Sequence, residues 1–142
     1  MALASGLLFE LSTEQMAMCA PNTQHCGGTG GCMGSTAELA FEYVTGSGGL
    51  VQEFQYGYTS YNGSQSACQI NKQVSASSAV ATINGYVHLP NNNYTVLMNA
   101  LATVGPVAIN VDATTWSAYD HGIYEGCNAQ ELDINHVVVL VG

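Results

Sequence analysis

The feature that most constrains the fold is an unbroken apolar run at residues 137–141, which His136 opens. A strand that is apolar at every position has both faces covered, whereas a strand with one wet face alternates apolar and polar residues. The earlier segment "PVAINVDA" does alternate, because Val107, Ile109 and Val111 are separated by residues of a different kind. We therefore expect "HVVVLVG" to be a central, covered strand and "PVAINVDA" to be a strand with two different faces.

Helical patterns precede these strands. Ser12 and Gln15 fit a capping box ahead of the segment "TEQMAMC", and Ser35 and Glu38 fit a second box ahead of a longer helix. A third helix is expected to end at Gly105-Pro106. The longer helix and the third helix both carry apolar residues at helical spacing on one face. These residues are Ala37, Ala40, Phe41 and Val44 in the longer helix, and Tyr94, Leu97, Met98 and Leu101 in the third.

Helices early and strands late predict an α+β chain. Residues 50–79 are rich in Tyr, Ser, Gln and Gly and are interpreted as long surface loops. A boundary near Asn84-Gly85 would divide a helical domain, residues 1–84, from a β domain, residues 85–142.

Charge excludes some partners. The chain has ten acidic residues and one basic residue, Lys72, which gives a formal net charge of −9 over 142 residues. Without a basic patch the chain cannot neutralise phosphates, so nucleic acid and anionic membrane surfaces are not expected partners. No apolar run approaches the length of a membrane span, and the first residues lack the basic flank of a signal peptide.

Other features favour the secretory pathway. Asn62 and Asn93 begin the glycosylation triplets Asn-Gly-Ser and Asn-Tyr-Thr. The chain also has five cysteines, and an odd number implies a free thiol, an intermolecular bond or a partner outside the sequence.

Two further patterns suggest cofactors only weakly. Zinc could be held by Cys19, His25, Cys26 and Cys32, but neither spacing nor a second knuckle fits a zinc site, and disulfides are the better interpretation. The segment "GGTGG" lacks the Lys of a phosphate-binding loop. We expect no metal and no cofactor.

In order, these segments resemble the papain-like cysteine peptidases, the cathepsin family. The segment "LSTEQMAMC" is similar to the family's helix that leads to a Cys, and "GGCMGSTAELAFEYV" to its substrate loop and the helix behind it. "GYVHLPNNNYTVLMNALATVGPVAINVDA" is similar to the crossing between its two domains, and "YDHGIYEGC" and "INHVVVLVG" to the region of its catalytic His. The resemblance implies a partial papain-like fold, with part of the helical left domain followed by part of the barrel-like right domain.

The resemblance implies that His136 is the catalytic histidine, which keeps a nucleophilic Cys as thiolate in a Cys–His–Asn site. The signature Cys-Gly-Ser/Ala-Cys-Trp/Tyr does not occur in the chain, and the segment with the family's triad Asn is also absent. None of the five cysteines is therefore assigned as the nucleophile.

The resemblance also implies the disulfide pairing. Cys19 pairs with Cys68, whereas Cys32 and Cys127 pair with cysteines of segments that this chain lacks. Cys26 is additional to the family pattern, and it bonds either upstream or to Cys32.

The substrate-binding residues follow by the same comparison. Gly34 and Ser35 stand where the family has a Gly-Gly whose backbone pairs with an extended peptide. Asn135 is also expected among the substrate-binding residues; it precedes the catalytic His and is not the triad Asn. The specificity pocket is expected to be lined by Thr36, Ala37, Asn110, Ile134 and Val137.

The resulting hypothesis is a segment of a papain-like endopeptidase that is inactive alone, acts on peptide or protein substrates as part of a whole enzyme, and is located in the lysosome or vacuole or outside the cell. We expect the isolated chain to aggregate, or to need its missing flanks or a partner chain over an exposed apolar face. The alternative is a non-catalytic, peptidase-like binding or structural subunit. A metal or redox module at Cys19, Cys26 and Cys32 is the third interpretation.

Overall fold

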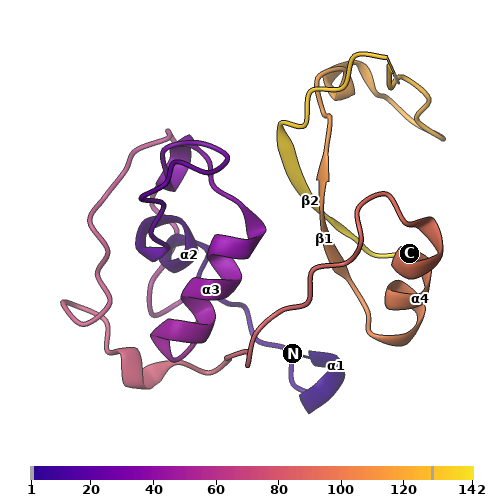
Figure 1. Ribbon diagram of the computed structural model, residues 1–142. Helices are drawn as coiled ribbons and strands as arrows, with labels where there is room; N and C mark the ends of the chain where they lie inside the picture. Colours follow the sequence, from indigo (N-terminus) through magenta and orange to yellow (C-terminus); the bar gives the residue numbers. More distant parts are fainter. Residues whose placement is uncertain (1, 129) are drawn as a thin grey trace. The chain divides into compact units, whose positions relative to one another are not determined.

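The computed structural model describes residues 2–128 and 130–142, which fall into two compact units. Unit 1 is Met1–His88 and unit 2 is Leu89–Gly142 (Figure 1). The chain is an α+β protein with helices in both units and one small antiparallel sheet in unit 2. The predicted domain boundary after residue 84 stays a prediction.

Unit 1 is built from short helices and long irregular segments. In chain order these are α1 (Ala2–Ser5), α2 (Thr13–Cys19), η1 (Gly31–Met33), α3 (Ala37–Ser47) and η2 (Ala76–Ser78). Helix α2 contacts both η1 and α3, and it lies beside α3 in Figure 1. The predicted helices are therefore confirmed as elements.

The two predicted capping boxes have different outcomes. The Oγ of Ser12 accepts a hydrogen bond from the backbone N–H of Gln15 at 2.9 Å, so Ser12 caps α2 as predicted. Ser35 does not cap α3. The cap is Thr36, whose hydroxyl accepts from the N–H of Leu39 at 3.5 Å, while the Oγ of Ser35 is buried without a hydrogen bond among the described residues. Adjacent hydroxyl residues satisfy the same sequence rule, and only the helix start at Ala37 selects between them.

The interpretation of residues 50–79 as surface loops is wrong at their beginning. Val51 is fully buried, and Leu50, Tyr56 and Ser60 are at most 8% exposed. Backbone hydrogen bonds join this stretch to segments far away in the sequence, such as the bond from the Leu50 N–H to the Ala81 carbonyl at 2.7 Å. Single apolar residues among polar ones showed no periodicity, so sequence alone gave no sign of this core.

Gln15 fastens α2 to its surroundings. Its side chain is 1% exposed, and its Nε2 donates to the Tyr43 hydroxyl and the Gly49 carbonyl, both at 3.0 Å. Its Oε1 accepts from the Val51 N–H at 2.9 Å. Three good hydrogen bonds satisfy a buried amide that would otherwise be costly. The amide therefore joins α2, α3 and the buried stretch.

Glu14 makes a second buried connection. Its Oε1 accepts from the hydroxyls of Thr59 at 2.8 Å and Ser60 at 3.1 Å, and its Oε2 accepts from the Thr59 N–H at 3.2 Å. Burial raises the pKa of Glu14, but these hydrogen bonds prevail, so the pKa lies below its ordinary value. The carboxylate is thus held ionised inside unit 1.

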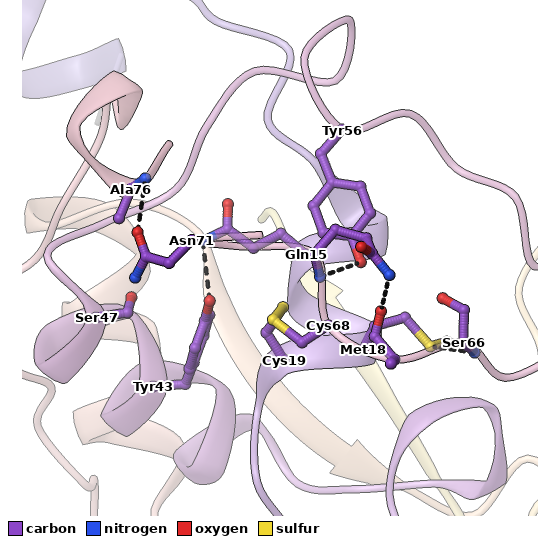
Figure 2. Close-up of a disulfide and its surroundings, with 12 residues drawn as sticks. Gln15, Met18, Cys19, Tyr43, Ser47, Tyr56, Ser66, Cys68, Asn71 and Ala76 are labelled. Carbon is purple, nitrogen blue, oxygen red and sulfur yellow. Dashed lines mark hydrogen bonds between the residues drawn. A yellow bond between two sulfur atoms is a disulfide. The ribbon is translucent and has the colours of Figure 1, made fainter. Parts of the chain in front are cut away.

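The Cys19–Cys68 disulfide is present in the structure. It joins the end of α2 to the loop after the buried stretch, across a sequence separation of 49 residues (Figure 2). Gln15 and Tyr43, which donate and accept in the network just described, lie near the disulfide in the same view. A covalent link and a polar network therefore hold the same helix.

Unit 2 contains one helix, α4 (Tyr94–Thr103), the short η3 (Trp116–Ala118) and two strands. The strands β1 (Val107–Val111) and β2 (His136–Leu140) pair antiparallel in a two-stranded sheet. The prediction of both strands is confirmed. The prediction that β2 is a covered central strand is wrong for the described residues, because β2 pairs with β1 alone and Val139 is 65% exposed.

The α4 stripe is also less buried than its pattern suggested. Leu97 and Leu101 are half-buried, whereas Tyr94 and Met98 are exposed. Asn93 caps this helix, since its Oδ1 accepts from the Val96 N–H at 3.1 Å. Within the described part of the chain, no helix has the length and apolarity to cross a membrane.

Candidate active site

The predicted catalytic histidine opens β2. His136 pairs with Val111 of β1 in the antiparallel register, and its side chain is exposed. Its ring stands edge-to-face against the ring of Trp116 in η3, with centroids 6.1 Å apart. An exposed imidazole on a paired strand has a fixed backbone and an accessible ring, as a general base requires.

Trp116 belongs to a group of aromatic rings that sequence reasoning missed. Its ring contacts Tyr124, with centroids 6.5 Å apart, and Tyr124 contacts Tyr119 at 5.8 Å, both edge-to-face. The hydroxyls of Thr115 and Tyr124 form a hydrogen bond. Trp116 is the only tryptophan of the chain, which is the one signal in the sequence that could have singled it out.

Asn135 fixes the chain just before His136. Its Oδ1 accepts from the Ala113 N–H at 3.0 Å, and its Nδ2 donates to the Thr114 hydroxyl at 2.9 Å. Its own N–H donates to the Val111 carbonyl at 3.1 Å. The side-chain amide and the backbone N–H of Asn135 thus hold the entrance of the strand together.

Asp112 reinforces the same corner. Its Oδ1 accepts from the Thr114 N–H at 2.9 Å and its Oδ2 from the Asp133 N–H at 3.2 Å. Hydrogen bonds from Thr114, and then from Asp133, lower the pKa of Asp112 below its ordinary value. The turn after β1 and the segment before β2 are therefore tied together at the position of the imidazole.

Two of the predicted pocket residues in unit 2 are brought together. Asn110 and Val137 are cross-strand partners, so their side chains project from the same face of the sheet. Ile134 lies outside the strand and is 58% exposed. Asn110 and Val137 thus form one continuous surface, to which Asn110 contributes a polar side chain and Val137 an apolar one.

The predicted substrate residues of unit 1 lie in a tightly folded glycine loop and at the start of α3. The carbonyl of Gly34 accepts from the Gly30 N–H at 2.8 Å and from Nδ2 of Asn22 at 3.3 Å. Gly34 has φ of +97°, and a Cβ there would collide with the Gly27 carbonyl, so only glycine fits. Ser35 follows, and within the described residues its backbone N–H and carbonyl form no hydrogen bond.

The predicted site residues are therefore divided between the units. Gly34, Ser35, Thr36 and Ala37 lie in unit 1, and Asn110, Ile134, Asn135, His136 and Val137 lie in unit 2. Each group is ordered by contacts within its own unit. Their assembly into one substrate site stays a prediction.

Comparison with known proteins decides the family. A model of the papain family cysteine proteases matches residues 1–142. The chain belongs to the papain family of cysteine proteases. Procathepsin L of Mus musculus is 36% identical over 144 residues, which cover 100% of this chain and 40% of that relative. Cathepsin K of Mus musculus is 32% identical, over 97% of this chain and 39% of the relative.

Solved structures agree with this assignment. Digestive procathepsin L 3 of the Tenebrio molitor larval midgut matches with a TM-score of 0.78 and 30% identity, over 99% of this chain and 42% of that one. A recombinant stem bromelain precursor matches with a TM-score of 0.77 and 27% identity, over 97% of this chain and 40% of that one. The fold is papain-like, and the chain spans about two-fifths of the length of the curated relatives it matches.

The remaining cysteines of this papain-family chain are free. Cys26, Cys32 and Cys127 are exposed thiols, so Cys26 and Cys32 are not bonded to each other in this structure. Their proposed pairing with other segments stays a prediction. Cys19 is held in the disulfide with Cys68, which removes it from the zinc set considered above, and the described residues contain no cluster of three metal-ligating side chains.

The glycosylation candidates are both at the surface. Asn62 lies in an exposed turn, and Asn93 is exposed at the start of α4. The cap at Asn93 uses the side-chain oxygen and leaves the nitrogen, to which a glycan would be attached, out of the cap. Modification of either residue stays a prediction.

Proposed function

We propose that the protein to which this chain belongs is a cysteine-type endopeptidase in which His136 is the catalytic base. The observation that carries the proposal is the position of His136, an exposed imidazole at the first residue of a paired strand in a papain-family chain. The Asn135 and Asp112 hydrogen bonds support it, because they fix the backbone that carries the imidazole.

The proposed reaction has two proton transfers at this imidazole. His136 takes the proton of a cysteine thiol that lies outside this chain, and the resulting thiolate attacks the carbonyl carbon of the peptide bond. The protonated imidazole then gives its proton to the leaving amine as the C–N bond breaks. Water hydrolyses the acyl-enzyme in the second half of the reaction and regenerates the thiol.

Substrate contacts are proposed on both units. The backbone N–H and carbonyl of Ser35, which form no hydrogen bond among the described residues, suit the main chain of an extended peptide. Thr36, Ala37, Ile134 and the paired Asn110 and Val137 would line the specificity pocket, and Asn110 would make it more polar than an all-apolar pocket. The proposed location is the lysosome or vacuole or the cell exterior, and the Cys19–Cys68 disulfide supports an oxidising compartment.

The first test concerns the chain as it stands. We expect no labelling of the 142-residue chain by a thiol-directed peptide probe, because none of its cysteines is assigned as the nucleophile. Mass spectrometry that finds the probe on Cys26, Cys32 or Cys127, and no longer finds it after His136→Ala, would show a nucleophile within this chain and overturn the proposed role.

The second test uses the flanking coding sequence. A segment of the type Cys-Gly-Ser-Cys-Trp, upstream and in frame, is expected, and the protein expressed with it should cleave peptides and be labelled at that cysteine. His136→Ala should lower kcat/KM by at least about a thousandfold, whereas His88→Ala is the matched control with little effect. Equal activity of both variants would contradict the assignment, and a protein without such a cysteine would favour the non-catalytic binding or structural subunit.

A further inference from the structure

A polar hollow lies in unit 1 and contains none of the proposed peptidase residues. It has a volume of about 360 Å³ and is formed by two stretches, within residues 55–59 and 66–74. Small-molecule sites in proteins have volumes of roughly 300 to 1,000 Å³, so the hollow is large enough for a small ligand. Tyr56 and Ser66, from its two stretches, lie near the disulfide in Figure 2.

The lining of the hollow is uncharged and combines polar with apolar surface. Three of the lining side chains are amides, Gln55, Gln69 and Gln73, and two more, Thr59 and Ser66, carry hydroxyls. An amide side chain has two N–H donors and an acceptor oxygen, and a hydroxyl both donates and accepts. The surface therefore offers donors and acceptors close together with no net charge.

Part of this capacity is unused within unit 1. Gln55 spends its Oε1 on the Gln52 N–H at 3.0 Å, and Gln69 spends its Nε2 on the Ala67 carbonyl at 2.6 Å. The Nε2 of Gln55, the Oε1 of Gln69 and the whole amide of Gln73 form no hydrogen bond with other described residues. A ligand can thus accept from the Gln55 Nε2, donate to the Gln69 Oε1, and do both with the amide of Gln73.

The hollow is also held in shape. The hydroxyl of the buried Tyr56 accepts from the Gln69 N–H at 3.3 Å, and Cys68, next to Gln69, is bonded to α2. The Gln69 carbonyl accepts from the N–H groups of Gln73 at 3.0 Å and Val74 at 3.1 Å. A site whose backbone is fixed beforehand loses less conformational entropy on binding.

These contacts select among ligand classes. The backbone N–H groups of residues 71–74 donate to carbonyls of the same turn, so these residues offer no free N–H groups to an extended peptide. No cation lines the hollow, and a chain of net charge −9 repels an acidic ligand. We propose that this hollow binds a neutral saccharide, whose hydroxyl groups donate to and accept from the three amides while Tyr56 and Val74 contact its C–H surface.

The test is a titration of the full, isotope-labelled chain with the disulfide formed, followed through the side-chain amide resonances of the glutamines. Maltotriose and triacetylchitotriose are the neutral probes, sialyllactose is the acidic probe, and trialanine is the peptide probe. We expect a neutral probe to shift the resonances of Gln55, Gln69 and Gln73 with a Kd at or below ~10 mM. Gln73→Leu should weaken that binding about fivefold to tenfold.

Gln24→Leu is the matched control, because Gln24 is exposed in the same unit and does not line the hollow. Its binding should equal that of the unchanged chain, and unaltered backbone resonances will show that Gln73→Leu is folded. The proposal is overturned if no neutral probe shifts the three resonances, if both variants lose binding equally, or if sialyllactose or trialanine binds more tightly than the neutral probes. None of these outcomes bears on the peptidase assignment of His136.

Discussion

In unit 1 the most deeply buried side chains include Ser12, Glu14 and Gln15, whereas in unit 2 the large apolar side chains are exposed or half-buried. No described residue of unit 2 is fully buried. Its exposed apolar residues include Val104, Ile123, Leu132, Val139 and Val141. Both units are ordered, but by different means: a polar network and a disulfide in unit 1, and a hairpin with a tied corner in unit 2.

This difference indicates which interactions stabilise each unit. A buried polar group costs free energy unless it is paired, so the network of unit 1 is stabilising only when complete. Exposed apolar side chains contribute little until something covers them. Substitutions inside unit 1 should therefore have large effects, and comparable substitutions in unit 2 should have small ones.

Loss of the disulfide should have the largest effect. Replacing Cys19 and Cys68 by Ser opens a covalent loop of 49 residues and should lower the free energy of unfolding of unit 1 by about 4 kcal/mol. Denaturant unfolding followed by circular dichroism measures this change. Trp116, the only tryptophan, lies in unit 2 and reports that unit separately by fluorescence. If the Trp116 transition moved by the same amount, the two units would not be independent and the comparison would fail.

Removal of the Glu14 carboxylate should have the next largest effect. Glu14→Ala leaves the hydroxyl of the buried Ser60 and the donors of Thr59 without their acceptor and should cost about 3 kcal/mol. Glu53→Ala is a control with less buried contacts, to Thr13 and Tyr58, and should cost less. Equal losses of unfolding free energy for the two variants would show that the burial of Glu14 does not increase its contribution to stability.

The same carboxylate predicts a pH dependence with a defined sign. Since the pKa of Glu14 is lower in the folded state than its ordinary value of 4.5, its ionised form stabilises unit 1. This contribution is fully present above that ordinary pKa and is lost as the pH falls through the lower, folded pKa. Glu14→Gln should flatten the acid limb of a plot of unfolding free energy against pH, and an unchanged limb would assign the acid loss to other groups.

Truncation of matched valines gives the most direct comparison of the units. Val51 is fully buried and Val139 is 65% exposed. Val51→Ala should lower the free energy of unfolding by about 2 kcal/mol, and Val139→Ala by less than about 0.5 kcal/mol, because only the first removes apolar surface from a core. A loss at Val139 as large as that at Val51 would mean that β2 is covered in solution.

Loss of the helix cap should have a smaller effect than truncation of the buried valine. Thr36→Ala removes the hydroxyl that accepts from Leu39 and should cost about 1 kcal/mol, measured by thermal or denaturant unfolding. Ser35→Ala removes a buried hydroxyl without a partner among the described residues and should be neutral or slightly stabilising. The reverse order would restore Ser35 as the cap.

Much of the secondary structure could be predicted from the sequence, because local rules decide it. The Ser12 cap, the Asn93-capped helix and the alternating strand at Val107–Val111 follow from side chains close together in the chain. The exposure of β2 and the burial of Leu50 and Val51 could not be predicted in this way. Burial depends on partners far away in the sequence. An apolar pattern in a strand indicates that its faces favour burial, but it does not indicate which segments cover them.

The candidate site could be proposed from the sequence only in part. Family resemblance indicated His136 and its neighbours, but the tasks of Asn135 and Asp112 at the strand entrance and the ring of Trp116 beside the imidazole needed coordinates. Hydrogen bonds between a turn and a segment far away in the sequence produce no recognisable residue spacing from which they could be predicted. The hydrogen bonds that fix the backbone at His136 are therefore harder to predict than the position of His136, whose catalytic role stays a proposal.

The cross-link between Cys19 and Cys68 has a consequence for biosynthesis. Both sulfurs, and the buried residues from Ser12 to Ser60, precede the first residue of unit 2, Leu89. Chains emerge from the ribosome at about 5–20 residues per second and fold N-terminal parts first. Unit 1 can thus oxidise and close while the valine-rich strand is still inside the ribosome, so this aggregation-prone segment emerges after unit 1 has folded.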